Sequence, residues 1–156
     1  MSELTNSIFY TKVHPRILFV LCLLLLIVNG YIFMFIREQY FPEWTGNSFR
    51  ETDSIYYIFV LACIVGPLVE TFLFQVAPNR LLISIGVQNE MILLIVPAVL
   101  FGLFHSYDSL YVVSASIGGL ILNYLYLNYK MHIKNAFLYV FLLHSLYNLY
   151  GFLFIE

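Results

Sequence analysis

The sequence predicts an all-α membrane protein, a polytopic bundle of about five transmembrane helices with a cytoplasmic N-terminus. Three observations support this fold class. Of the 156 residues, 62% are hydrophobic and only 10% are charged. Several apolar runs are long enough to cross the hydrocarbon core of a bilayer, which is ~30 Å thick and takes about 20 helical residues. Basic residues gather on alternate loops, and this bias orients a chain in the membrane.

Five apolar runs are the candidate helices: Ile17 to Ile36, Ser54 to Gln75, Met91 to His105, Leu110 to Leu127, and Ala136 to Ile155. The first run follows Lys12 and Arg16, as a secretory signal would. Its length, and the Asn29-Gly-Tyr31 that stands in place of a small-residue cleavage site, favour a retained helix. Residues 81–87 are too short to span, so we expect them at the cytoplasmic interface or as an oblique extension of the following helix.

The charges outside these runs predict the orientation of the chain. The one substantial loop, residues 37–53, holds two basic residues, whereas the N-terminal tail and the two loops that alternate with it hold five: Lys12, Arg16, Arg80, Lys130 and Lys134. This excess places the N-terminus in the cytoplasm and the C-terminus outside. The predicted organisation is a cytoplasmic tail (1–16), a first helix with its external loop (17–53), and a helical core (54–156).

Composition also limits the partners and the compartment. The net charge of −2 and the lack of a basic cluster argue against a nucleic-acid partner. Cys22 and Cys63 lie within apolar runs without CxxC spacing, so both are interpreted as small buried hydrophobic residues. We expect an integral protein of a bacterial plasma (inner) membrane, with the lipid bilayer as its main surroundings; the oligomeric state is left open.

Three ionisable groups lie inside the apolar runs: Glu70, His105 and His144. An ionisable side chain near the bilayer centre costs on the order of 3 kcal/mol even on lenient insertion scales, so such a residue indicates function by default. Their occurrence on three separate helices predicts one convergent site. At 1.5 Å per residue, Glu70 is ~8 Å and His144 ~12 Å from the cytoplasmic helix end. His105 matches this level only if its helix starts or kinks at Pro97, which places the site in the cytoplasmic half of the membrane.

The spacing of the polar residues predicts a shared cavity. His144 and Asn148 are four residues apart, and Phe101 and His105 repeat this spacing on another helix, so each pair lies on one helical face. A glutamate, two histidines and an asparagine provide a base for water, a partner for its proton and donors for an oxyanion. These are the groups that a peptide hydrolase needs.

Three segments resemble the ordered motifs of the CPBP intramembrane proteases, the CAAX prenyl endopeptidase and bacteriocin-processing family. The segments are Glu70-Thr-Phe-Leu-Phe-Gln75, Phe101-Gly-Leu-Phe-His105 and His144-Ser-Leu-Tyr-Asn148, and the family motifs are EExxxR, FxxxH and HxxxN or HxxxD. The resemblance covers roughly residues 61–152. It implies a helical bundle with an intramembrane cavity that opens toward the cytoplasm.

The resemblance also implies roles for individual residues. Glu70 would activate the attacking water with His105 beside it, while His144 and Asn148 would stabilise the oxyanion. Two positions depart from the family pattern, because Thr71 replaces the second acid and Gln75 replaces the arginine. An acid and a base at this one-turn spacing can pair. Replacing both the acid and the arginine leaves the net charge of the site unchanged. Neutral hydrogen bonds would then have to hold the group that the charged pair orients in the family.

Structural roles compete with these functional interpretations. Glu70 could be protonated and bonded to a neighbouring helix, and either histidine alone would more often serve helix packing. Asn123 is interpreted as an interhelical hydrogen-bonding residue. Asp108 either orients His105 or, as we favour, belongs to a turn at the helix end.

Three function classes follow from the sequence. The leading one is an intramembrane endopeptidase that cleaves a membrane-associated peptide or protein with a glutamate-activated water. The second is a non-enzymatic scaffold or bacteriocin-immunity-type protein on the same fold. The third is a redox or transport protein in which His105 and His144 bind haem or a metal. No cofactor is expected, although Glu70, His105 and His144 also form a plausible zinc set.

Overall fold

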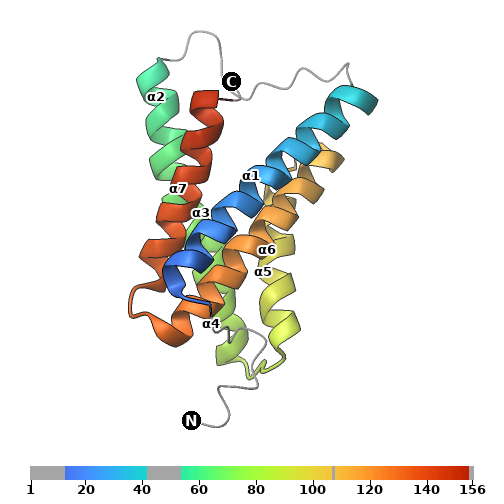
Figure 1. Cartoon of the computed structure of the whole chain (residues 1–156). Helices are drawn as coiled ribbons and strands as arrows, with labels where there is room; N and C mark the ends of the chain where they lie inside the picture. Colours follow the sequence, from blue (N-terminus) through green and yellow to red (C-terminus); the bar gives the residue numbers. More distant parts are fainter. Residues whose placement is uncertain (1–12, 42–53, 107, 155–156) are drawn as a thin grey trace.

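The computed structural model describes residues 13–41, 54–106 and 108–154, and within these ranges every regular element is helical. The helices run up and down in an antiparallel bundle (Figure 1). The order is α1 (Pro15–Tyr40), α2 (Ile55–Val60), η2 (Leu61–Val65), α3 (Gly66–Thr71), η3 (Phe72–Val76), α4 (Ala77–Ser84), α5 (Glu90–Phe104), α6 (Ser109–His132) and α7 (Ala136–Phe154). The prediction of an all-helical membrane bundle is confirmed.

In the described part of the chain, four helices are long and apolar enough to cross a membrane: α1, the continuous helix from Ile55 to Ser84, α6 and α7. The fifth predicted span, α5, has 15 residues and is therefore ~22 Å long, shorter than the hydrocarbon core. The protein is an integral membrane protein with α5 as a short helix inside the bundle. Helix α6 packs against α5, α1 and α7, and α7 packs against η2 and α3.

The predicted end of the second helix and the alternative helix start at Pro97 are wrong, whereas the predicted start at Met91 agrees with α5 to within one residue. The second helix continues through Ser84 instead of ending at Gln75, so Leu81 to Ser84 extend the preceding helix and not the following one. The following helix begins at Glu90 and contains Pro97 in its interior. The side chain of Asn89 determines this start, because it accepts hydrogen bonds from the backbone N–H groups of Met91 (2.9 Å) and Ile92 (3.2 Å), as a helix N-cap does.

Prolines explain the two π-helical stretches, η2 and η3, within the continuous helix. A proline inside a helix lacks the N–H and its ring collides with the carbonyl four residues earlier. For Pro67 that carbonyl belongs to Cys63, the central residue of η2, and for Pro78 it belongs to Phe74, the central residue of η3. A π turn moves the carbonyl aside. Each proline is thus accommodated by a π-helical stretch centred one turn before it.

Small residues allow α5 and α6 to pack closely. A Cβ atom built on Gly102 would lie 1.9 Å from Ser116 Oγ and 2.7 Å from the carbonyl oxygen of Val112, and one on Gly119 would lie 3.0 Å from the carbonyl oxygen of Ala98. Close backbone approach at small residues is the usual basis of helix association in membranes. This packing fixes the position of the C-terminal end of α5, where His105 lies.

A buried asparagine pair connects three helices. Asn123 of α6 donates to the carbonyl oxygens of Leu93 (2.8 Å) and Leu94 (2.9 Å), and its Oδ1 accepts from Asn79 of α4 (2.7 Å). The Leu93 carbonyl would normally bond to the N–H of residue 97, which is a proline. Asn123 therefore satisfies an acceptor that Pro97 leaves without its helical donor, and its predicted interhelical role is confirmed.

The hydrophobic core lies between α1, α6 and α7 and includes Leu26, Leu122, Leu125 and Leu143, each no more than 1% exposed. Cys22 and Cys63 are both buried, as predicted. Many large apolar side chains on the outer faces are exposed in the absence of lipid, and these faces are suited to contact with the acyl chains of a bilayer.

Candidate active site

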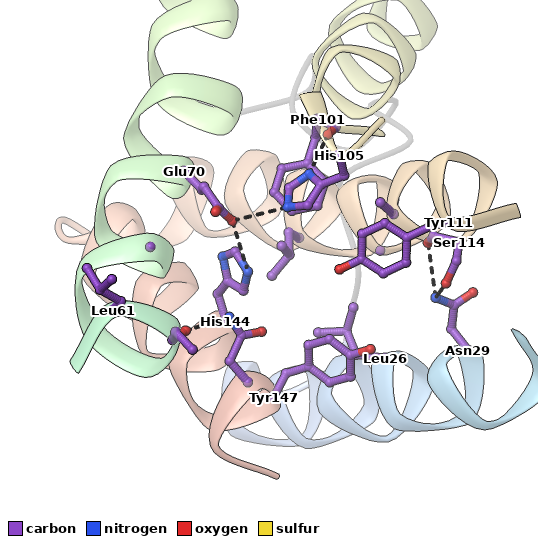
Figure 2. Close-up of a pocket in the computed structure, with 16 residues that line it drawn as sticks. Leu26, Asn29, Leu61, Glu70, Phe101, His105, Tyr111, Ser114, His144 and Tyr147 are labelled. Atoms are coloured by element: carbon purple, nitrogen blue, oxygen red, sulfur yellow. Dashed lines mark hydrogen bonds and ion pairs between the residues drawn. The ribbon is translucent and has the colours of Figure 1, made fainter. Parts of the chain in front are cut away.

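Three helices bring the ionisable residues together near the middle of the bundle. Oε2 of Glu70 lies 3.7 Å from Nε2 of His105 and 3.6 Å from Nε2 of His144. Figure 2 shows the carboxylate of α3 pointing toward an imidazole of α5 and one of α7. Both distances exceed a direct hydrogen bond. They are short enough for one small molecule to contact the carboxylate and an imidazole together.

These residues border an internal cavity of about 280 Å³. Its lining includes all four residues for which catalytic roles were predicted, Glu70, His105, His144 and Asn148, and also Phe101. A second cavity of about 390 Å³ shares Tyr111, Ser114, Tyr147 and Asn148 with the first and extends it toward Arg37. The predicted convergence of the four polar residues on one cavity is therefore present in the structure.

The two π-helical stretches lie on either side of the short helix α3, which carries Glu70. Gly66, one turn before Glu70, has its N–H bonded to the carbonyl of Leu61. A Cβ atom at Gly66 would lie 2.9 Å from that carbonyl oxygen and 3.6 Å from Oε1 of Glu70. Glycine at this position thus keeps the π turn tight and leaves space beside the carboxylate.

His105 caps the C-terminal end of α5 and is held by two local contacts. Its Nδ1 lies 2.8 Å from the carbonyl oxygen of Phe101. A carbonyl can only accept, so Nδ1 carries the proton in this bond, and a neutral His105 presents an unprotonated Nε2 to Glu70. The Phe101 ring lies 4.4 Å from the His105 ring and 5.7 Å from that of His144 (centroid distances). Phe101, predicted as a supporting residue, packs against both imidazoles.

His144 is 4% exposed, and its Nδ1 has no hydrogen-bond partner among the described residues. One turn further along α7, the side-chain amide of Asn148 donates to the carbonyl oxygen of Ala62 (2.8 Å). In a π turn this carbonyl would bond to the N–H of residue 67, which is a proline. Asn148 therefore satisfies an acceptor left open by Pro67, and one amide hydrogen remains for the cavity.

Thr71 and Gln75, at the positions where the family motif has an acid and an arginine, are both fully buried. Neither lines the cavity that contains Glu70. Within the described part of the chain, Thr71 Oγ1 and both amide atoms of Gln75 lack hydrogen-bond partners. The expected replacement of the charged pair by neutral hydrogen bonds from these two residues is not found. The backbone of α3 instead sets the position of Glu70, and its carboxylate points toward the two histidines.

Four polar residues of the cavity lining were missed by the sequence analysis: Asn29, Tyr111, Ser114 and Tyr147. Asn29 of α1 is 8% exposed and donates to the carbonyl oxygen (3.1 Å) and the hydroxyl (3.3 Å) of Ser114. Figure 2 shows Tyr111 and Tyr147 across the cavity from Glu70. Asn29 could have been found as the one amide inside the first apolar run. The tyrosines give no such signal, because tyrosine is common near the ends of membrane helices.

Asp108 caps α6 and does not orient His105. Its Oδ1 accepts from the backbone N–H of Tyr111 (2.8 Å), and its Oδ2 pairs with Arg37 of α1 (3.1 Å). This ion pair joins the end of α1 to the start of α6. The interpretation of Asp108 as a residue of the local helix boundary was therefore the better one.

The position of the cavity conflicts with one pair of expectations. Its extension is lined by the C-terminal half of α1, the start of α6 and the end of α7, including Arg37, Leu110 and Phe152. These segments lie at the end of the bundle opposite the start of α1 (Figure 1). A cytoplasmic N-terminus and a cavity that opens toward the cytoplasm therefore cannot both hold in this fold.

The prediction that the three ionisable groups lie at similar distances from their cytoplasmic helix ends is wrong for a related reason. Glu70 lies 14 residues from Ser84, and His105 lies 15 residues from Glu90, so each is ~21–22 Å along its helix, compared with ~12 Å for His144. The helix ends on this side are at different levels, because α4 and the start of α5 extend beyond the start of α7 (Figure 1). The three groups meet without a helix start at Pro97.

Glu70, His105 and His144 are also a candidate set of zinc ligands. Two imidazoles and a carboxylate suit Zn²⁺, whose ligands at 2.0–2.1 Å in tetrahedral geometry lie about 3.3 Å apart. The distances from Glu70 to the two histidines are somewhat longer, at 3.6 and 3.7 Å, and no group of three or more metal-ligand side chains was found among the described residues. The three residue types suit Zn²⁺, but the distances between them are longer than those between the ligands of a bound zinc ion.

Comparison with known proteins supports the interpretation of the site. Searches of curated proteins and of solved structures each found no significant match. A family model, Rce1-like, described as type II CAAX prenyl endopeptidase Rce1-like, matches residues 52–150. This match covers more than half of the chain and includes all three motifs, with every ionisable residue of the cavity. The match and the cavity together place this chain in the Rce1-like family of CAAX-type intramembrane proteases.

Proposed function

We propose that this protein is an intramembrane endopeptidase in which the carboxylate of Glu70 activates a water molecule. The observation that carries the proposal is the distance of 3.6–3.7 Å from one carboxylate oxygen to two imidazoles in a cavity within the bundle. Histidines with a purely structural role would normally form hydrogen bonds to a neighbouring helix. Here the two Nε2 atoms instead face a common acid beside an open volume.

The neutral tautomer of His105 favours a bridging role for water. Nε2 of His105 and Oε2 of Glu70 are both acceptors in this state, and they are 3.7 Å apart. A water molecule between them can donate one proton to each, which aims its lone pair into the cavity. When that lone pair attacks a peptide carbonyl, Glu70 takes the proton and His105 holds the second one in place.

Two other polar side chains of the cavity can stabilise the negative charge that forms on the carbonyl oxygen. The second amide hydrogen of Asn148 and an N–H of His144 are the candidate donors, since both side chains line the cavity. The proton on Glu70 then passes to the leaving amine, and the carbon–nitrogen bond breaks. The carboxylate is regenerated, so the cycle requires no other reactant than water.

The substrate class is a peptide or a segment of a membrane protein, and the expected location is a bacterial plasma membrane. The family description refers to prenylated CAAX proteins. Comparing prenylated with unprenylated peptides tests whether this protein requires a prenyl group on its substrate. The cavity itself is apolar at Leu26, Leu61 and Leu122 and polar at the motif residues, which suits an extended peptide with apolar side chains.

The decisive experiment is the Glu70→Gln substitution in purified protein reconstituted in liposomes. Glutamine keeps the shape of the side chain but cannot take a proton, so cleavage of prenylated and unprenylated reporter peptides should fall to background. Glu90→Gln, at the start of α5 and outside the cavity, is the matched control and should cleave normally. Normal cleavage by a folded Glu70→Gln variant would show that the assignment is wrong.

Metal dependence is tested on the same preparation. If Glu70 acts directly on water, activity should survive exhaustive chelation, and the purified protein should lack stoichiometric zinc. Loss of activity on chelation with recovery on zinc alone would make Glu70, His105 and His144 ligands, and the ion would then activate the water. An absorbance spectrum of the same sample tests the haem alternative, which requires a strong haem band.

A non-enzymatic scaffold is the second candidate, and one observation favours it. Asn148 already uses an amide hydrogen to bind the carbonyl of Ala62, and His105 uses Nδ1 to bind that of Phe101. The polar residues thus also hold helices together. Under this alternative, Glu70→Gln would reduce thermal stability, and the wild-type protein would cleave none of the peptides.

A further inference from the structure

A third cavity, separate from the candidate active site, is bordered by three basic side chains. It has a volume of about 370 Å³ and is lined by Arg80 of α4, Lys130 of α6 and Lys134 of the turn before α7. All three side chains are exposed at this end of the bundle. No carboxylate is among its lining residues, although the whole chain has more acidic than basic residues.

The first turn of α7 forms another wall of this basic cavity, through Asn135, Ala136 and Phe137. The first N–H groups of a helix have no acceptor within the helix, and the helix dipole makes this end favourable for anions. The carbonyl of Asn135 accepts from residues 138 and 139, which leaves the N–H groups of Ala136 and Phe137 in that unpaired position. Positive side chains and helix N–H groups therefore border one space.

Apolar side chains complete the lining. Val76, Ile133 and Leu138 border the same cavity as the three cations, and Leu138 is 46% exposed. Glu90 lies at this end of the bundle but is not among the lining residues. A ligand that fits must therefore have an anionic group next to a hydrocarbon portion. A free inorganic anion would use only the polar half of the lining.

The cavity also lies at the right depth for a lipid headgroup. It is formed where three membrane helices begin or end: the end of the long helix at Ser84, the end of α6 at His132 and the start of α7 at Ala136. Helix ends of membrane proteins lie at the level of the headgroups, and basic pockets between helices at this level are suited to anionic lipids.

We propose that this cavity binds the phosphate of an anionic phospholipid, with Arg80, Lys130 and Lys134 around the headgroup and Ile133 and Leu138 against an acyl chain. The bound lipid joins α4, α6 and α7. The first of these continues the helix of Glu70, and the last carries His144, so lipid binding stabilises the arrangement of the helices around the candidate active site. The proposal does not depend on catalysis, because the basic cavity contains none of the active-site residues.

The test is binding of short-chain phosphatidylglycerol to the full chain in a neutral detergent, with short-chain phosphatidylcholine and inorganic phosphate as comparisons. The variant Lys130→Gln/Lys134→Gln removes two cavity charges. The control, Arg16→Gln, removes an exposed charge of α1 that does not line the cavity. Each basic residue near a membrane surface contributes about 1 kcal/mol to the binding of anionic lipid, so the cavity variant should bind phosphatidylglycerol about 30-fold more weakly.

The wild type should bind phosphatidylglycerol at least tenfold more tightly than phosphatidylcholine and raise its unfolding temperature on binding, while the control variant keeps its affinity within about threefold. Equal losses in the two variants would show a general surface-charge effect and overturn the proposal. Equal affinity for inorganic phosphate and phosphatidylglycerol would overturn the lipid assignment. If the double variant does not fold, Lys134→Gln alone should weaken binding about fivefold, and unchanged binding there would also contradict the site.

Discussion

At the scale of single residues, Asn148 has two tasks that the sequence motif did not separate. Its amide donates to the carbonyl of Ala62, which lacks a helical donor because of Pro67, and its side chain also lines the cavity beside His144. The motif thus combines a structural bond between α7 and η2 with a candidate donor for the oxyanion. Substitution at this position should therefore affect both stability and turnover.

We expect Asn148→Ala to lower turnover by about 10²- to 10³-fold, as loss of one oxyanion donor does, and also to lower the unfolding temperature. Asn123→Ala is the matched control, because Asn123 is another buried interhelical amide but lies away from the cavity. It should lose about 0.6–1.7 kcal/mol of stability and keep the turnover of its folded fraction. Turnover and thermal unfolding would be measured on the same reconstituted samples. Equal effects of the two substitutions on turnover would assign Asn148 to structure alone.

At the scale of the elements, close packing of α5 against α6 positions His105. Helix α5 is short, and its C-terminal residue lies at the level of Glu70 because Ala98 and Gly102 allow α6 to approach. The hydrogen bond of the His105 ring is made to the carbonyl oxygen of Phe101, on the same helix. A displacement of α5 along α6 would therefore move the imidazole away from the carboxylate.

Gly102→Ala should destabilise the protein by about 1–3 kcal/mol, the usual cost of overpacking. The added Cβ would lie 2.7 Å from the backbone carbonyl oxygen of Val112, which cannot rotate away as a side chain can. Gly151→Ala provides the comparison, since a Cβ atom on Gly151 meets nothing within 4 Å, and it should be neutral or slightly stabilising. The measurement is thermal unfolding in the same detergent. A Gly102→Ala protein as stable as the Gly151→Ala protein would contradict the close contact between α5 and α6.

At the scale of the whole molecule, the direction in which the cavity extends is the main result. The lining of its outer part includes Arg37, which pairs with Asp108. These residues lie at the end of the bundle opposite Arg16, Arg80, Lys130 and Lys134, four of the five basic residues that predict a cytoplasmic N-terminus. The charge bias then places the outer part of the cavity on the external side. The family resemblance placed it on the cytoplasmic side.

Single cysteines at the two ends decide between these orientations. In a variant with Cys22 and Cys63 replaced by alanine, Ser109→Cys introduces a thiol at the Arg37 end and Ser84→Cys one at the opposite end; both serines are exposed. With a cytoplasmic N-terminus, a membrane-impermeant maleimide added to intact cells should label position 109 and not position 84. The reverse pattern would place the N-terminus outside and the cavity toward the cytoplasm.

The sequence by itself determined the elements and the residues that can react. Apolar length identifies a membrane helix because each residue contributes a fixed rise, and a spacing of four residues places His144 and Asn148 on one face wherever their helix lies. The rarity of charges in such runs then identifies Glu70 and its two histidines. These inferences are local, so they required no knowledge of which helix packs against which.

Only the tertiary structure decided how far the helices extend and which side of the site is hollow. The second helix continues past two prolines because π turns accommodate them, and α5 contains Pro97 because Asn123, 30 residues after Leu93, satisfies the carbonyl that the proline leaves open. The contribution of α1 to the cavity, through Asn29 and Arg37, likewise depends on contacts with α6 that are distant in sequence. A hydrogen bond or cavity wall formed between distant segments depends on their relative positions in space, and packing of the whole bundle sets those positions.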